Sequence, residues 1–318
     1  MWQGANGGYM VIDEILSYFD EWNGHRFGST RPLCFDDHGA FGCYRGMRLY
    51  SVFQPLLNAR NLTVSAHEAL LRVRDERDHP LSPADAFAIP PTPSEAIYFD
   101  RLCRMVHILN FVQQANVDVD AELFLNVSGR HLLSLNSGHG QTFERLLHLC
   151  GLTPDQIILE VLEARVDDID RLREAVDAYR SRGYRVAIDD FGCQSSNFDR
   201  LWRLTPDIVK LDRSLIVQAT TNERARRILP KLIEIIHELD AQVVCEGIET
   251  LDQHTLAIDA DADLVQGYYY ARPSPLLIDP SIQVKSRSTQ SSRRTDVAPT
   301  PPAVGVARAS FAIQVTLP

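Results

Sequence analysis

Paired cysteine motifs are absent from this sequence. The chain has 318 residues and six cysteines, but no two cysteines are separated by only two residues. Zinc knuckles and disulfide frameworks depend on closely spaced cysteines, so the observed scatter argues against both. We expect most of the thiols to act as small hydrophobic groups inside the protein.

The sequence also lacks the long hydrophobic runs of membrane proteins and secreted precursors. The first basic residue is Arg26, and no long uncharged apolar stretch follows the start. We therefore expect neither a secretory signal nor membrane insertion. The sequence predicts a cytoplasmic protein.

An excess of positive charge is absent as well. There are 32 Lys and Arg residues against 42 Asp and Glu residues, which gives a formal net charge of −10. Long nucleic acids are bound largely because Lys and Arg neutralise their phosphates, so we expect no DNA or RNA polymer as a partner. A small nucleotide held by a few placed groups is compatible with this charge.

The composition that is present is that of a folded protein. Hydrophobic residues make up 45% of the chain and charged residues 23%, which suits a full core, and the length allows two domains or one large barrel. We expect a short N-terminal extension over residues 1–45, with a helix over 10–19, and one domain over 46–276. Residues 277–318 are predicted to be a disordered tail, because few core-forming residues occur from about Ser281 onward.

Apolar runs of strand length alternate with amphipathic stretches of helix length between these ends. One unit consists of a helix over 169–179 followed by a strand over 184–188. A second consists of a helix through 228–239 and a strand over 242–245, with Pro230 expected either to kink the helix or to mark its start. Repeated βα units predict an α/β protein with a parallel sheet or barrel.

Polar side chains gather where the apolar strands end. They are Asn126, Glu160, Asp189 with Asp190, Lys210 with Asp212, and Glu246. In a βα barrel the carboxyl ends of all strands open on one face, so these side chains can converge on one pocket. Their oxygen atoms suit magnesium or manganese, and the number of acids favours a two-metal site. Taken singly, each acid is more simply explained as a helix N-cap. The same placement of polar residues after five strands favours a shared site.

Short motifs in a fixed order cover residues 46–276. They are Phe53-Gln54-Pro55-Leu56, Glu68-Ala69-Leu70-Leu71-Arg72, Asn126-Val127-Ser128, Glu160-Val161-Leu162-Glu163, Asp189-Asp190-Phe191-Gly192, Lys210-Leu211-Asp212, Glu246-Gly247-Ile248-Glu249 and Gln266-Gly267-Tyr268. A Glu-Ala-Leu string alone is weak evidence, because these residues are common in helices, whereas the ordered set is specific. In this set the chain resembles the EAL-domain cyclic di-GMP phosphodiesterases.

The resemblance implies a modified TIM-like (βα)8 barrel that forms a homodimer. It also implies hydrolysis of cyclic di-GMP to linear pGpG with two divalent cations, Mg or Mn. Carried over residue by residue, the first cation would be held by Glu68, Asn126, Glu160 and Asp189. The second would be shared by Asp189 and held by Asp190 and Glu246. The implied catalytic residues are Glu68, Asp189, Lys210 and Glu246.

Lys210 would orient the attacking water or offset charge, and its simpler interpretation is a structural ion pair with Asp212 or another neighbour. The resemblance assigns substrate binding to Gln54, Leu70, Arg72, Asp212 and Gln266. If the segment is strand throughout, Arg72 faces the same side as Leu70, where its guanidinium suits a phosphate oxygen.

The two glutamines at strand ends, Gln54 and Gln266, would meet guanine or ribose edges, or they serve as caps. Glu163 and Glu249 would support the loop around the metals. The simpler interpretation of both acids is a first-turn helix residue favoured by the helix dipole.

The loop after the two consecutive aspartates departs from the family pattern. Where the family has glycine and an aromatic residue, this chain has Gln194 and Ser195. A glycine can adopt a φ that costs other residues on the order of 1 kcal/mol, so the change bears on activity and regulation. The alternatives to an active enzyme are therefore a degenerate module that binds cyclic di-GMP as a receptor, and a protein-interaction module.

Overall fold

The structure is a computed structural model that describes residues 8–23, 31–114, 122–134, 140–162, 168–192 and 198–279. All of these residues lie within one structural unit, Met1–Ser281. Of the predicted tail, only residues 277–279 are described. No helix in the described ranges is long and apolar enough to cross a lipid bilayer.

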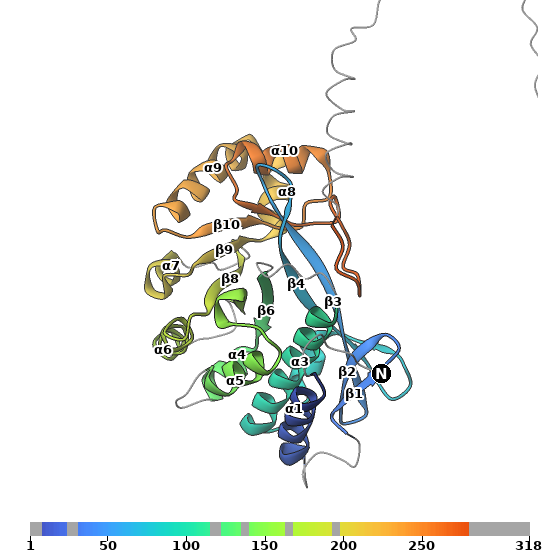
Figure 1. Ribbon diagram of the computed structural model, residues 1–318. Helices are drawn as coiled ribbons and strands as arrows, with labels where there is room; N and C mark the ends of the chain where they lie inside the picture. Colours follow the sequence, from blue (N-terminus) through green and yellow to red (C-terminus); the bar gives the residue numbers. More distant parts are fainter. Residues whose placement is uncertain are drawn as a thin grey trace, which may run out of the picture. The chain divides into compact units, whose positions relative to one another are not determined.

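Strands and helices alternate through most of the chain (Figure 1). The strands are β1 (Leu33–Asp36), β2 (Gly39–Tyr44), β3 (Met47–Asn58), β4 (Val64–Arg74), β5 (Pro80–Leu81), β6 (Glu122–Val127), β7 (Ile157–Leu162), β8 (Arg185–Phe191), β9 (Ile208–Leu211), β10 (Gln242–Cys245) and β11 (Leu264–Val265). The helices are α1 (Gly8–Asn23), α2 (Pro83–Ala88), α3 (Pro93–Gln113), α4 (Gly129–Ser134), α5 (Gln141–Leu149), α6 (Ile169–Arg180), α7 (Phe198–Leu204), α8 (Arg213–Thr221), α9 (Glu223–His237) and α10 (Leu251–Asp259).

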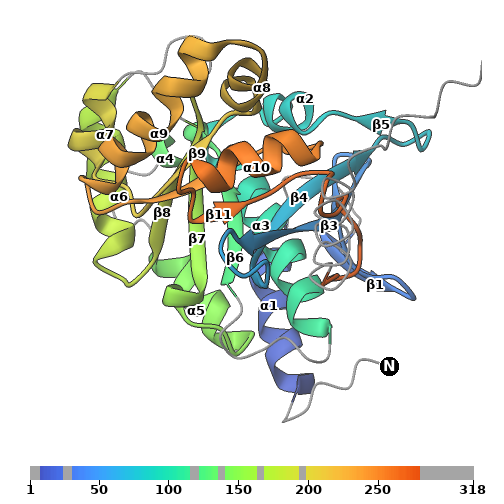
Figure 2. The same ribbon diagram turned by 90° about the horizontal axis from the view of Figure 1, so that it is seen from above.

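Eight of the described strands close into a barrel. From β4 through β6, β7, β8, β9 and β10 to β11 every neighbouring pair is parallel. The ring closes through β3, which is antiparallel to both β4 and β11, and helices surround the strands (Figure 2). This topology confirms the α/β prediction and, because one strand runs against the other seven, the modified form of the TIM-like barrel.

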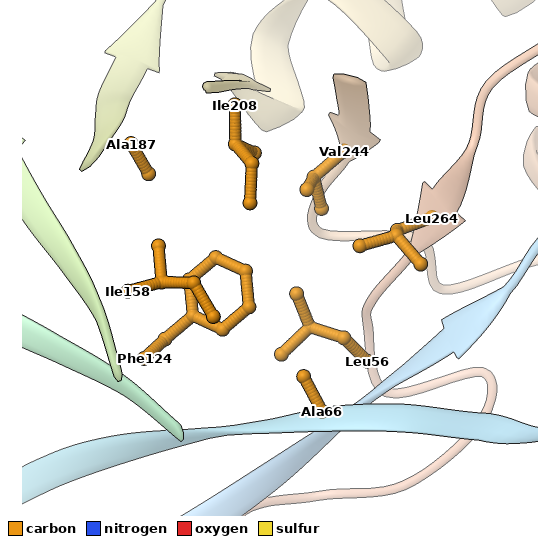
Figure 3. Close-up of a cluster of buried hydrophobic side chains, with 8 residues drawn as sticks. All are labelled: Leu56, Ala66, Phe124, Ile158, Ala187, Ile208, Val244 and Leu264. Carbon is orange, nitrogen blue, oxygen red and sulfur yellow. The ribbon is translucent and has the colours of Figure 1, made fainter. Parts of the chain in front are cut away.

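The barrel interior is filled by one apolar side chain from each of its eight strands. These residues are Leu56, Ala66, Phe124, Ile158, Ala187, Ile208, Val244 and Leu264, and Figure 3 shows them pointing toward one another. Such a layer makes the barrel a packed core rather than a pore. Anything that binds must therefore bind above this layer, at a barrel end.

The predicted βα units are present, with one correction. The helix expected over 169–179 is α6, and the strand after it is β8. Pro230 lies inside α9 and does not mark its start. The helix begins a full turn or more earlier because the side chain of Asn222 accepts hydrogen bonds from the backbone N–H groups of Arg224 and Ala225.

The N-terminal extension is built onto the barrel domain. The helix expected over 10–19 is α1, which lies beside α3 and α5 (Figure 1). Its buried Phe19 contacts Tyr98 of α3 edge-on with ring centroids 5.8 Å apart, and Arg101 of α3 donates a 2.8 Å hydrogen bond to the hydroxyl of Tyr18. Strands β1 and β2 extend the sheet outward from β3.

Candidate active site

A polar layer lies directly above the apolar layer of the barrel. Successive side chains on a strand alternate between its two faces, so the residue two positions from each core residue also points inward. In seven strands this residue follows the core residue, whereas in the antiparallel β3 it precedes it. The layer consists of Gln54, Glu68, Asn126, Glu160, Asp189, Lys210, Glu246 and Gln266. The strands thus bring together predicted residues that are up to 212 positions apart in sequence.

Lys210 lies at the centre of the polar layer and is only 1% exposed. Its Nζ atom is 2.7 Å from Glu246 Oε1 and 3.3 Å from Asp189 Oδ1. It also forms ion pairs with Glu160 and, at 3.5 Å, with Glu68. A pairing with Asp212 is not what the structure shows, so Lys210 counters the acids of the site itself.

Amide side chains connect the remaining carboxylate oxygens. Asn126 donates from Nδ2 to Glu160 at 2.9 Å and to Glu68 at 3.4 Å. Gln266 donates from Nε2 to Glu68 at 2.8 Å. Glu68 therefore contacts three polar neighbours from three other strands, which holds its carboxylate in place at the barrel end.

The site carries more negative charge than Lys210 can balance. Burial, partly offset by Lys210, raises the pKa of Glu246 to about 8. Burial and the charge of Glu68 also raise the pKa of Glu160 well above its ordinary value. For Lys210, the surrounding carboxylates outweigh burial and raise the pKa. The acids thus compete for one counter-charge, and a divalent cation would supply the charge that is missing.

Three acids are placed closely enough to share a metal ion. Asp189, Asp190 and Glu246 each offer a ligand atom, and these atoms lie within 4.8 Å of one another. Consecutive strand residues normally face opposite sides, but the pairing of β8 with β9 is irregular between Ile188 and Phe191. Asp190 there has a φ of 57°, in the left-handed region. The irregularity turns Asp190 so that its carboxylate lies close to that of Asp189.

A cavity of about 540 Å³ opens beside the acids. Its walls include Glu68, Asn126 and Asp189 on one side, and Leu70 and Arg72 of β4 next to them. Strand β4 is continuous through this segment, so Glu68, Leu70 and Arg72 share one face as expected. Arg72 is an exposed residue, and its guanidinium donates at Nη1 to the carbonyl of Leu71.

Three of the residues predicted to bind substrate or to support the metal loop make structural contacts. The Gln54 side chain donates to the carbonyl of Ala271 at 3.0 Å. Asp212 caps α8, because its carboxylate accepts the backbone N–H of Ser214. Glu249 is exposed and accepts a 2.7 Å hydrogen bond from Arg213.

Some of the predicted residues lie outside the part of the chain that the structure describes. Glu163 lies outside the described residues, and so do Gln194 and Ser195 of the altered loop. The sequence did not predict the α3 wall of the cavity, which includes Arg104 and His107. The polar residues of α3 follow no strand and no motif, so the sequence carried no signal for them.

Comparisons with known proteins agree with this geometry. A family model described as the EAL domain matches residues 43–273. Over 230 residues the chain is 30% identical to the cyclic di-GMP phosphodiesterase NbdA of Pseudomonas aeruginosa, which covers 70% of this chain and 29% of NbdA. The chain spans between 29% and 44% of the length of the first curated relatives that it matches.

Solved structures of BlrP1 from Klebsiella pneumoniae are similar to this fold. The complex with calcium and cyclic di-GMP aligns with a TM-score of 0.64 at 27% identity, over 72% of this chain and 57% of that one. The complex with manganese and cyclic di-GMP aligns with a TM-score of 0.65 at 25% identity, over 84% and 68%. With the matching family model and the barrel described above, the chain is a member of the EAL domain family.

Proposed function

We propose that this protein hydrolyses cyclic di-GMP to linear pGpG with two divalent cations, Mg or Mn. The observation that carries the proposal is the polar layer, in which acids from β4, β7, β8 and β10 converge around one buried lysine. Burial raises the pKa values of two of these acids, Glu160 and Glu246, and convergent buried acids are costly in a folded protein unless they bind something positive. Metal-assisted phosphodiester cleavage is the chemistry that uses such a site.

The residues present fit two cations. Glu68, Asn126, Glu160 and Asp189 would hold one, and Asp189, Asp190 and Glu246 the other, the latter three having ligand atoms within 4.8 Å of one another. When bound, the cations would polarise the phosphodiester and lower the pKa of an attacking water.

Lys210 acts together with these acids. Its ammonium is fixed by four carboxylates, so it donates hydrogen bonds from one defined position. From there it orients the water and offsets negative charge that develops on the phosphate.

The substrate would lie across the acids and the adjoining cavity. Arg72 is exposed at the cavity wall and offers a fork of donors to a phosphate oxygen. Leu70 supplies an apolar surface beside it. Gln54 lies within β3, while Asp212 and Gln266 directly follow β9 and β11. NbdA is named a cyclic di-GMP phosphodiesterase, and BlrP1 was solved in complex with cyclic di-GMP. Both similarities support this choice of substrate.

Turnover by the purified chain tests the proposal. Cyclic di-GMP is incubated with the protein and Mg²⁺, Mn²⁺ or Ca²⁺, and the products are separated by chromatography. Formation of pGpG with Mg²⁺ or Mn²⁺ is the expected result. An intact nucleotide after hours, with a metal and a folded protein present, would refute hydrolysis.

The second candidate function is that of a receptor that binds cyclic di-GMP without cleaving it. It is favoured by Gln194 and Ser195, which replace the usual glycine and aromatic residue directly after the paired acids. Binding without turnover in the same assay would select it. The homodimer and the cytoplasmic location implied earlier stay predictions, and light scattering of the purified chain tests the first.

A further inference from the structure

The cavity beside the acids reaches well beyond them toward α2 and α3. Its apolar surface includes Leu70 and Leu71 of β4 and Phe87 of α2. The wall formed by α3 carries two nitrogen-bearing side chains, Arg104 and His107. A volume of about 540 Å³ with mostly apolar walls and a few polar groups is typical of a site for a small organic ligand.

His107 is the polar group of that wall whose unused hydrogen-bonding atom is not fully buried, whereas the unpaired nitrogens of Arg104, Nε and Nη1, are. The residue is 5% exposed, and its Nδ1 lies 2.7 Å from Ser51 Oγ of β3. Its other ring nitrogen, Nε2, has no hydrogen-bond partner in the described part of the chain. Burial, together with Arg72 and Arg104, lowers the pKa of His107 to about 3, so the imidazole is neutral and offers Nε2 as one donor or one acceptor.

Arg104 is less suited to meet a ligand. Its Nη2 already pairs with the buried Asp100, and its guanidinium lies over the ring of Phe143 with 4.3 Å between Cζ and the ring centroid. Arg104 is 1% exposed. Its unpaired nitrogens, Nε and Nη1, are fully buried, which leaves His107 as the group of the α3 wall best placed to bind a molecule that fills the cavity.

We propose that His107 is a binding residue for one base of the cyclic dinucleotide, with Nε2 making a hydrogen bond to the edge of that base. The inference rests on the function proposed above. A purine base has two apolar faces and a polar edge, which matches apolar walls that end at one polar atom. The same cavity is bordered by Glu68, Asn126 and Asp189, so a nucleotide can place its phosphate at the acids and its base near His107.

The competing interpretation is structural, in which the bond between His107 and Ser51 only satisfies a buried polar pair. That interpretation leaves Nε2 open to the cavity without a protein partner, so that only water meets it. A base bound in the cavity would replace that water with a direct hydrogen bond. The two interpretations therefore differ in what a change of His107 does to ligand affinity.

The test compares His107→Leu with the conservative His107→Gln, whose amide can still make a hydrogen bond. Dissociation constants for cyclic di-GMP are measured by calorimetry with Ca²⁺, and KM with Mn²⁺. We expect His107→Leu to weaken binding and raise KM about tenfold, as for the loss of one buried hydrogen bond, and His107→Gln to stay within about threefold of wild type.

A substrate without bases separates ligand recognition from structure. Hydrolysis of bis(p-nitrophenyl) phosphate needs the metal site, but this substrate has no base that could contact His107. We therefore expect His107→Leu to hydrolyse it at a rate within about twofold of wild type, while KM for cyclic di-GMP shows the full tenfold rise. Equal losses for both substrates, or unchanged affinity for cyclic di-GMP, would overturn the assignment. If His107→Leu does not fold, Ala88→Trp fills the cavity from the exposed helix α2, and unchanged nucleotide binding in that variant overturns it as well.

The outcome for His107 is distinguishable from the outcome for the proposed function. A wild-type protein that binds cyclic di-GMP without cleaving it refutes hydrolysis and leaves the His107 measurement intact. If the wild-type protein cleaves the nucleotide and His107→Leu binds it as tightly as wild type, only the role of His107 is refuted. A wild-type protein that neither binds nor cleaves the nucleotide refutes both.

Discussion

The proposed chemistry depends on single carboxylates, and Glu68 is one whose contacts are fully described. Its two oxygens contact Asn126, Lys210 and Gln266, so it couples β4 to three other strands. We predict that Glu68→Ala abolishes hydrolysis of cyclic di-GMP but leaves the fold intact, because the residue lies at the barrel mouth above the packed core. The loss should exceed the roughly 10- to 100-fold expected for residues that only support a metal ligand.

The matched control for Glu68→Ala is Glu122→Ala. Glu122 is also a barrel acid, but it lies at the opposite end of β6 from Asn126 and pairs with Arg185. Turnover and thermal unfolding are measured for both variants. More than about a tenth of wild-type turnover in Glu68→Ala would contradict its role as a metal ligand, since ligand loss should cost more than that.

The buried His107 should make the stability of the folded protein depend on pH. The pKa of His107 is about 3 in the folded protein and about 6.5 in an unfolded chain. Between these values the unfolded state binds a proton that the folded state does not, so stability is lost as pH falls below about 6.5. We predict that this loss, up to about 1.4 kcal/mol per pH unit from this one group, is absent in His107→Gln.

Urea unfolding at pH 6.5, 5.5 and 4.5 checks this prediction. Acidic groups titrate in the same range, but they are common to both proteins, so the difference between wild type and His107→Gln isolates the histidine. Parallel stability curves for the two proteins would show that His107 is protonated in the folded state.

At the scale of elements, the alternation along strands explains what the sequence could predict. Glu160 and Lys210 follow apolar strand residues by two positions, so their convergence follows once the barrel is predicted. The placement of Asp190 could not be predicted in this way, because it depends on an irregular pairing between β8 and β9. His107 was also beyond prediction, since only the packing of α3 against β3 and β4 brings it to the cavity.

The loop that follows β8 carries the next prediction. Asp189 and Asp190 match the family pattern and are the proposed metal ligands, whereas Gln194 and Ser195 differ from that pattern. We predict that the double change Gln194→Gly with Ser195→Tyr raises turnover with little change in metal affinity, because loop placement and not ligation would then limit the rate. Steady-state kinetics and Mn²⁺ titration measure the two quantities. An inactive protein that still binds nucleotide, and that the double change does not rescue, would favour the receptor.

At the scale of the whole molecule, the N-terminal extension belongs to the same folded body as the barrel. Phe19 of α1 is fully buried against α3. We predict that Phe19→Ala lowers the free energy of unfolding by about 3–5 kcal/mol, the usual cost of truncating a buried Phe. Urea unfolding measures this cost, with the exposed Glu21→Ala on the same helix as the control. A loss below about 1 kcal/mol in Phe19→Ala would show that α1 detaches without affecting the barrel.

Charge at the barrel mouth should also control the stability of the whole molecule. Four carboxylates surround Lys210, and Asp190 adds a further negative charge beside them. A cation that binds the folded state but not the unfolded chain stabilises the fold, by about 3 kcal/mol at a hundredfold excess over its Kd. We therefore predict that Mn²⁺ raises Tm by several degrees and that EDTA reverses the rise. Asp190→Asn, in an exposed acid of the proposed metal site, should reduce the rise, whereas Asp259→Asn, in an exposed acid at the end of α10, should not. Equal Tm with and without saturating Mn²⁺ would mean that the acids are held together by Lys210 and their own protons alone.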